Sequence, residues 1–319
     1  MKQFDIITNF SSLYELIMYF DSEEKCEEHL ANLRWNDEPK CPSCSKKNVS
    51  MLKGKRKQYK CYGCKRKFSV KTGSVFQDSK LPLLKWFVAI YLFTSHKRGI
   101  SSHQLAKDVK VSQKTAWFML HRIRVIFEGK NDVKLDGEVQ IDETYVGGDM
   151  KNMSNAKRAK IHEEKRQTGM EHKAAVLGLM DKDEVIAMPI PKSNKENILP
   201  IIDKLVDKKA IVITDGFGAY RAVGKTHARH VIVMHSAGEY VKDGFSTNNI
   251  ENFWSHFKRT IVGTYFHMSD WHLAAYVDES TYRFNTRDLG EGERFDLTLA
   301  NSNKTLSWNE LVKKGKNRA

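Results

Sequence analysis

Four cysteines in two closely spaced pairs constrain the fold of this 319-residue chain more than any other feature. Cys41 and Cys44 form one C-x2-C pair, Cys61 and Cys64 form another, and sixteen residues lie between the pairs. Each pair places two thiolates on one side of a turn, and two such turns complete a tetrahedral zinc site. Gly63 is expected to supply the permissive backbone of the second turn. Four thiolates leave no open coordination position, so the predicted zinc is structural.

Disulfide bonds or free thiols are the alternative interpretation of these cysteines. Glu15 interrupts the apolar residues near the N-terminus, so no secretion signal is expected and a reducing cytosol is the expected compartment. Zinc is therefore favoured, and so small a module should need the metal to fold. Cys26 lies outside the pattern and shares a helical face with Leu30 and Leu33, which predicts a buried apolar residue rather than a ligand.

The chain carries a strong excess of positive charge. Its 53 Lys and Arg against 39 Asp and Glu give a formal net charge of +14, and twelve of the basic residues lie between Lys40 and Lys71 with no acidic residue among them. Such a distribution indicates a polyanionic partner, although a merely soluble basic protein is the alternative. The longest apolar run, residues 86–93, is too short to span a bilayer, so no membrane segment is expected.

Residues 101–124 have the layout of a helix-turn-helix, with Ser101 or Ser102 capping the first helix and Ser112 capping the second. Many helix pairs in bundles share this layout, but the neighbouring basic module favours DNA binding. The second helix would lie in the major groove. Its side chains expected to contact DNA are Gln113, Lys114, Trp117, His121 and Arg122.

From residue 138 the pattern changes from helices to strands. Helical patterns lie between and after these strands, at about 195–207, 247–260 and 269–287. Consecutive strands followed by strands that alternate with helices predict an α/β domain, with a mixed sheet flanked by helices. The polar, basic stretch 151–172 is expected to be a mobile loop. The predicted strands are 138–146, 173–180, 184–190, 210–214 and 230–235.

Three carboxylates stand out in this second half. Asp142 lies within an apolar strand, Asp215 directly follows another, and Glu251 lies on a helix whose other face is apolar. Because successive strand residues point to opposite faces, Glu143 is expected to be the outward-facing neighbour of Asp142. Lys258 follows Glu251 by seven positions, or two helical turns, so both project from one helix face.

Two strand-end aspartates and a helix glutamate suit a two-metal site, because carboxylate oxygens are the ligands that Mg²⁺ prefers. Two ions about 4 Å apart would activate the attacking oxygen and stabilise the departing one in a phosphoryl transfer, with Lys258 holding a phosphate. No serine, cysteine or tyrosine has the setting of a nucleophile. The alternatives are an ordinary turn residue at each aspartate and a solvated helix face at Glu251. Rival third carboxylates are Glu239, Asp243 and Glu279.

These segments together resemble the bacterial insertion-sequence transposases of the zinc-ribbon type, which carry a DDE catalytic domain of the RNase-H-like, integrase-like fold. The resemblance implies that Asp142, Asp215 and Glu251 bind two Mg²⁺ or Mn²⁺ ions, and that Lys258 is the basic residue that follows them. Lys258 and the neighbouring Arg259 are expected to contact DNA. Ser246 stands where many relatives have His. The segments that carry the resemblance are 41–76, 139–148, 211–220, 246–279 and 282–287.

A chain with this resemblance is expected to bind terminal inverted repeats and target DNA, to cleave strands, and to join them through a 3′-hydroxyl. It would act as a homodimer or higher oligomer on DNA, in the cytoplasm and associated with the nucleoid. A DNA-binding regulator and an RNase-H-like nuclease without strand transfer are the alternatives. The predicted divisions are an N-terminal helical segment (1–37), a zinc ribbon (38–72), a helix-turn-helix region (73–130), the catalytic domain (131–290) and a C-terminal tail (291–319).

Overall fold

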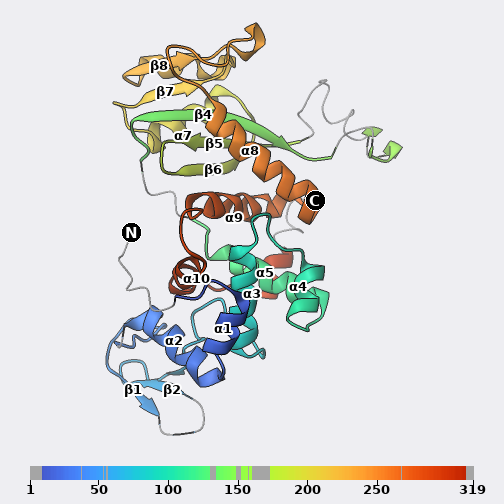
Figure 1. Ribbon diagram of the computed structural model, residues 1–319. Coiled ribbons are helices and arrows are strands. Elements are labelled where there is room, and N and C mark those ends of the chain that lie inside the picture. The colour runs from blue at the N-terminus through green and yellow to red at the C-terminus, as the bar shows by residue number, and fades with distance from the viewer. Residues whose placement is uncertain are drawn as a thin grey trace. The chain divides into compact units, whose positions relative to one another are not determined.

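The chain divides into two compact units in the computed structural model (Figure 1). Unit 1 comprises Met1–Glu128 and Thr286–Ala319, and unit 2 comprises Gly129–Asn285, so unit 2 is inserted into the sequence of unit 1. The predicted mobile loop 151–172 lies largely outside the described residues. The structure describes residues 9–36, 38–52, 54, 57–129, 134–148, 152–156, 158–159, 173–266 and 268–313.

Unit 1 is mainly helical, and serine side chains begin several of its helices. Ser22 Oγ accepts a hydrogen bond from the Lys25 N–H, and the hydroxyl oxygens of Ser101 and Ser112 cap α4 and α5 in the same way. Within the described ranges, no helix has the length and apolar character needed to cross a membrane. The helices are α1 (Leu13–Tyr19), α2 (Glu23–Trp35), α3 (Leu83–Ser95), α4 (Ser102–Asp108), α5 (Gln113–Val125), α10 (Glu291–Ala300) and α11 (Trp308–Lys313).

The C-terminal segment, predicted as a tail, contains the helices α10 and α11. Phe295 of α10 is fully buried, and its ring packs on Phe10, Phe20 and Phe87 with centroid distances of 5.3, 6.0 and 5.3 Å. These partners belong to the first hundred residues of the chain. Sequence periodicity within 291–319 is weak because the segment completes a core whose other members are distant in sequence.

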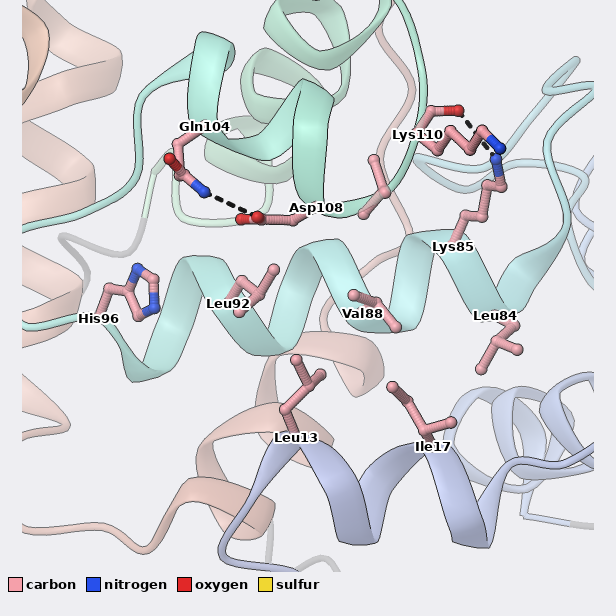
Figure 2. A pocket seen from close by; sticks show the side chains of 11 residues that line it. Leu13, Ile17, Leu84, Lys85, Val88, Leu92, His96, Gln104, Asp108 and Lys110 are labelled. Atoms are coloured by element: carbon pink, nitrogen blue, oxygen red, sulfur yellow. Dashed lines mark hydrogen bonds between the residues drawn. The ribbon is translucent and has the colours of Figure 1, made fainter.

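An apolar groove of about 710 Å³ opens between α1, α3 and α4 (Figure 2). Leu13 and Ile17 line it from α1, and Val88 and Leu92 line it from α3. Its polar residues are engaged locally, since the Gln104 side-chain amide donates to Asp108 at 2.7 Å. The lining therefore offers apolar contact rather than a set of reactive groups.

Unit 2 is built on a five-stranded sheet in the order β6-β5-β4-β7-β8. Strands β6, β5 and β4 are antiparallel, whereas β4, β7 and β8 are parallel. The sheet is therefore mixed, as the sequence predicts. Its strands are β4 (Glu138–Val146), β5 (Ala174–Met180), β6 (Val185–Ile190), β7 (Ile211–Thr214) and β8 (Arg229–Ile232).

Helices cover both faces of this sheet. Helix α7 (Lys195–Leu205) and the 3-10 helix η3 (Gly218–Lys225) pack on the face that carries Ile141 and Leu177. Helices α8 (Asn248–Thr260) and α9 (Leu273–Asn285) pack on the opposite face, where α8 crosses the sheet (Figure 1). Three short segments complete the unit: η4 (His235–Ala237), the π-helical η5 (Ile261–Tyr265) and η6 (Asp270–His272).

Candidate active site and zinc centre

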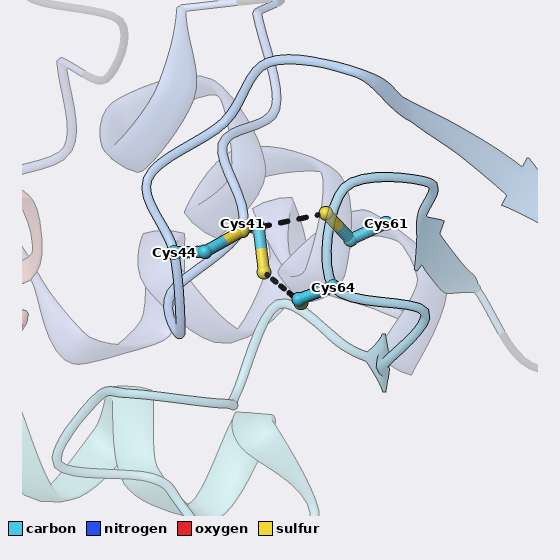
Figure 3. A group of neighbouring side chains, drawn as sticks. All are labelled: Cys41, Cys44, Cys61 and Cys64. Carbon is cyan, nitrogen blue, oxygen red and sulfur yellow. Dashed lines mark hydrogen bonds between the residues drawn. The ribbon is translucent and has the colours of Figure 1, made fainter.

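The four predicted zinc ligands lie together beside a small antiparallel sheet of β1 (Val49–Leu52), β2 (Gln58–Cys61) and β3 (Lys67–Phe68). Their Sγ atoms all lie within 4.8 Å of one another, with 3.6 Å between Cys41 and Cys64 and 3.5 Å between Cys44 and Cys61 (Figure 3). Tetrahedral zinc with Zn–S bonds of about 2.3 Å requires sulfur atoms about 3.8 Å apart. The cluster therefore fits a structural zinc ion.

The two cysteine turns are built alike. The Cys41 N–H donates to the Lys46 carbonyl at 3.1 Å, and the Cys61 N–H donates to the Arg66 carbonyl at 2.9 Å. The left-handed residues of these turns are Ser45 and Lys65, with φ of 57° and 63°. The prediction that Gly63 supplies this conformation is wrong. A Cβ at position 63 would lie 2.5 Å from Cδ of Lys46, an exposed and flexible side chain that can move aside.

Cys26 is fully buried on α2, as its apolar helical face predicts. Burial raises the pKa of its thiol to about 12, so the thiolate form that binds metals is strongly disfavoured. Cys26 is thus a packing residue, separate from the four-cysteine cluster.

Loss of zinc is expected to unfold the ribbon, because its buried core consists of Cys41, Cys61 and Phe68 with a few partly buried neighbours. Cys44→Ala should reduce the zinc content, measured by atomic absorption, from one ion per chain to nearly none. It should also make the amides of residues 41–68 exchange rapidly in hydrogen–deuterium exchange. Cys26→Ala is the matched control and should retain the zinc. A fully protected ribbon in Cys44→Ala would contradict the structural role.

The predicted helix-turn-helix is present as α4 and α5, and the first turn of α5 is exposed. The Gln113 side-chain amide donates to Ser102 Oγ at 2.8 Å. The Lys114 Nζ lies 4.7 Å from the ring centroid of Trp308, and the half-buried ring of Trp117 packs on the same indole at 5.8 Å. The C-terminal α11 therefore supports the helix that is predicted to contact DNA.

Two of the predicted DNA-contacting residues lie inside unit 1. His121 is 2% exposed and Arg122 is 8% exposed. The Arg122 guanidinium donates to the carbonyls of Val75, Gln77 and Leu306 at 3.0, 2.8 and 3.0 Å, and burial lowers its pKa. Arg122 thus joins separate chain segments. We therefore leave His121 and Arg122 out of the proposed DNA contacts.

The register of the sheet places Asp142, in the middle of β4, beside Asp215, which directly follows β7. In the parallel pair β4 and β7, Ile141 pairs with Thr214, and the next residues are Asp142 and Asp215. Because paired residues of parallel strands point to the same face, the following residues also share a face. The strand pairing therefore explains how two aspartates 73 positions apart come together.

Helix α8 brings the glutamate to the same face. The Ile250 N–H donates to the side-chain oxygen of Gln140 on β4 at 3.1 Å. Gln140 and Asp142 lie two positions apart and thus share a face of β4. Glu251 follows Ile250 on α8, so the first turn of this helix is fastened beside Asp142.

The electrostatics of Asp142 are consistent with neighbouring carboxylates. Burial and, after it, the negative charges of Glu143, Asp215 and Glu251 together raise the pKa of Asp142 to about 7. Among the described residues, the four cysteines form the group whose ligand atoms all lie within 4.8 Å of one another, and the three carboxylates do not form such a group. Repulsion among acids at a partly buried site is what a divalent cation would relieve, so the donor set fits such an ion.

Glu143 lies on the opposite face of β4, as alternation predicts, but it is half-buried rather than outward-facing. Its carboxylate accepts a hydrogen bond from the Tyr220 hydroxyl, and burial raises its pKa. The sequence signal for this partner is weak, because Tyr220 lies 77 positions further along the chain.

The rival third carboxylates have partners elsewhere. Glu279 is fully buried, forms an ion pair with Arg283 at 2.7 Å and accepts a hydrogen bond from Tyr265. Asp243 pairs with Arg229 at 3.1 Å. Glu239 accepts a hydrogen bond from the Met234 N–H at 3.3 Å. The charge of Glu251 is among the main causes of the raised pKa of Asp142, and the charges of these three residues are not.

Two polar residues beside Glu251 are not indicated by the sequence. Thr247 Oγ donates to Glu251 Oε1 at 2.9 Å, and His235 Nδ1 lies 3.2 Å from the same oxygen. His235 belongs to a stretch that reads as the end of a strand. The imidazole beside the carboxylate belongs to His235.

Gly178 of β5 faces Asp142 across the antiparallel pair and lets α8 approach the sheet. A Cβ at this position would lie 2.5 Å from Trp254 Cζ2 and 3.1 Å from Ile250 Cδ1. Gly178→Ala is therefore expected to displace α8 and to destabilise unit 2 by about 1–3 kcal/mol, measured by denaturant unfolding. Gly218→Ala, where nothing lies within 4 Å, is the control. Unchanged stability of Gly178→Ala would mean that α8 packs differently.

A mixed five-stranded sheet flanked by helices is the architecture of the RNase-H-like DDE class. Residues 134–285 match the ISXO2-like transposase domain, and residues 21–67 match the transposase zinc-ribbon domain. The chain is also 30% identical, over 244 residues, to an uncharacterized protein in transposable element ISH50 of Halobacterium salinarum. The match covers 74% of this chain and 82% of that relative. The chain belongs to the family of zinc-ribbon transposases with an ISXO2-like transposase domain, which confirms the resemblance seen in the sequence.

Proposed function

We propose that this transposase cleaves DNA at the ends of its element and joins the resulting 3′-hydroxyl to target DNA, with Asp142, Asp215 and Glu251 holding two divalent ions. The parallel register of β4 and β7 is the observation that carries the proposal, because it sets two aspartates side by side. The attachment of α8 to Gln140 adds Glu251 to them.

The bound ions, Mg²⁺ or Mn²⁺, supply stabilisation of charge on the attacking and departing oxygens of the phosphoryl transfer. The chain's own residues hold those ions and the DNA. Asp142 has to release its proton to act as a ligand, and the raised pKa of its carboxyl keeps that proton bound near neutral pH while no cation is nearby. Lys258 and Arg259 are exposed on α8, the helix that carries Glu251. Their charges are therefore available to phosphates of the DNA strand that reacts at the metal ions.

We propose that unit 1 recognises the terminal inverted repeats. The zinc ribbon supplies twelve Lys and Arg between residues 40 and 71 with no acidic residue among them, and the N-terminal part of α5 supplies Gln113, Lys114 and Trp117 for the major groove. Joining requires two element ends to be held together, so the active assembly is proposed to contain at least two copies of the chain.

A strand-transfer assay tests the proposal. The purified chain, with its zinc retained, is mixed with labelled DNA ends from the element and a target plasmid in Mg²⁺ or Mn²⁺. Joined products from the wild type, and none from Asp215→Ala, are expected. Tight binding of the ends with no cleavage in either metal would instead favour a DNA-binding regulator. Cleavage without joining would favour a nuclease.

A further inference from the structure

The hydroxyl of Thr247 is used in an unusual way. Thr247 directly precedes α8, where a threonine oxygen normally accepts an N–H of the first helical turn. Here the hydroxyl makes no such bond and donates to Glu251 Oε1 at 2.9 Å. Gln140 of β4 accepts the Ile250 N–H in its place. Thr247 therefore hydrogen-bonds to the carboxylate of Glu251, and Gln140 of β4 caps α8 in its place.

His235 closes a ring of contacts around the same oxygen. Its Nε2 lies 3.1 Å from Thr247 Oγ, and its Nδ1 lies 3.2 Å from Glu251 Oε1. The ring of Tyr240 packs on the imidazole with a centroid distance of 5.4 Å, which restricts its rotation. The extension of β8 carries His235 to this place, because the Val233 N–H donates to the Thr214 carbonyl at 2.9 Å, next to Asp215.

Both contacts use one oxygen of the glutamate. Among the residues that the structure describes, Glu251 Oε2 has no hydrogen-bond or ion-pair partner, and the Glu251 side chain is 45% exposed. A free glutamate on a helix surface samples several rotamers. Fixing Oε1 at two points selects one of them and leaves Oε2 open.

We propose that His235 and Thr247 are positioning residues that hold Oε1 of Glu251 and thereby present Oε2 to a divalent cation. The inference rests on the proposed function, because it assumes that Glu251 is a metal ligand. Groups that orient metal ligands through hydrogen bonds typically change metal affinity or activity by about 10–100-fold when they are removed. The loop after β8 then belongs to the catalytic machinery, although it carries none of the three carboxylates.

Replacing Thr247 by valine removes the hydroxyl and keeps the side-chain shape. In the full chain with its zinc retained, Thr247→Val is expected to bind Mn²⁺ about tenfold more weakly, measured as free Mn²⁺ by electron paramagnetic resonance. Half-maximal cleavage should need correspondingly more Mn²⁺. Thr247→Ser keeps the hydroxyl and should restore both values. Thr260→Val is the matched control, because Thr260 is also buried on α8 and its hydroxyl donates only to the His256 carbonyl.

His235→Ala should weaken Mn²⁺ binding similarly, and the double variant should lose little more than the larger single effect, because both residues act on one oxygen. Wild-type Mn²⁺ affinity in Thr247→Val, together with a lowered melting temperature, would overturn the proposal and leave a purely structural hydrogen bond. Asp215→Ala is measured in parallel. If Asp215→Ala also binds Mn²⁺ like the wild type, the metal site of the proposed function fails, and this inference fails with it. If Asp215→Ala alone loses Mn²⁺, only the positioning role fails.

Discussion

Replacing Asp142 by asparagine is expected to abolish DNA cleavage and, at the same time, to stabilise unit 2 when no divalent cation is present. Both effects have one cause. Burial and the neighbouring carboxylates raise the pKa of Asp142 to about 7, so the ionised side chain is disfavoured in the folded protein. Asparagine removes the charge and keeps the shape. It also removes the ligand that the proposed chemistry requires, so cleavage should fall by at least about a thousandfold.

The sign of the stability effect follows from proton linkage. The pKa of Asp142 is about 7 in the folded chain, against about 3.9 for an unfolded aspartate. Between these two pH values the folded state binds more protons than the unfolded state, so the free energy of unfolding falls as pH rises. The gain from Asp142→Asn should therefore be absent near pH 4 and present above pH 7, with a size of roughly 1–3 kcal/mol.

Hydrogen–deuterium exchange of β4 and β5, at pH 5 and pH 8 without added Mg²⁺, measures this gain separately from unit 1. Added Mg²⁺ should stabilise the wild type and leave the asparagine variant unchanged. Asp203→Asn is the control, because Asp203 lies on the exposed side of α7 and pairs with Lys208. Cleavage at the wild-type rate by Asp142→Asn would refute the proposed role of this carboxylate.

The sheet of unit 2 could be predicted almost completely from the sequence. The strand predicted at 138–146 has the bounds of β4, and the other strands and helices differ from their predictions by a few residues at their ends. These elements carry strong local patterns: continuous apolar runs for the buried strands, and apolar residues at helical spacing for α8. Each pattern lies within the element itself, so reading it requires no knowledge of the partners.

Contacts between elements distant in sequence could not be predicted in this way. The sequence places Arg122 on a helix. It does not show that the Arg122 guanidinium donates hydrogen bonds to the carbonyls of residues 75, 77 and 306. The hydrogen bond that Glu143 accepts from Tyr220, and the one between His235 and Thr247, could not be predicted for the same reason. The register of β4 and β7 and the contact of α8 with Gln140 favour the grouping of Asp142, Asp215 and Glu251. That grouping and its catalytic role stay predictions that the assays above decide.

Phe295→Ala is expected to unfold or strongly destabilise unit 1, even though position 295 lies in the segment that reads as a tail. The ring fills the space between Phe10, Phe20 and Phe87, so its removal leaves a cavity among side chains that other contacts already fix. Truncation of a buried phenylalanine costs about 3–5 kcal/mol, a large share of the stability of a domain of this size. Binding of the element ends should weaken in parallel, since the proposed DNA contacts all belong to unit 1 except those on α8.

Phe266→Ala is the matched control, because Phe266 is exposed on unit 2 and its truncation opens no cavity. Urea unfolding followed by hydrogen–deuterium exchange distinguishes the two units: Phe295→Ala should lose protection in α2 and α3 while β4 and β5 keep theirs. The result also decides how the chain is organised. If α10 is part of the core of unit 1, the insertion of unit 2 between residues 128 and 286 means that unit 1 is complete only after the whole of unit 2 has been synthesised. Unchanged protection of α2 and α3 in Phe295→Ala would restore the C-terminal segment to a tail and unit 1 to a contiguous N-terminal domain.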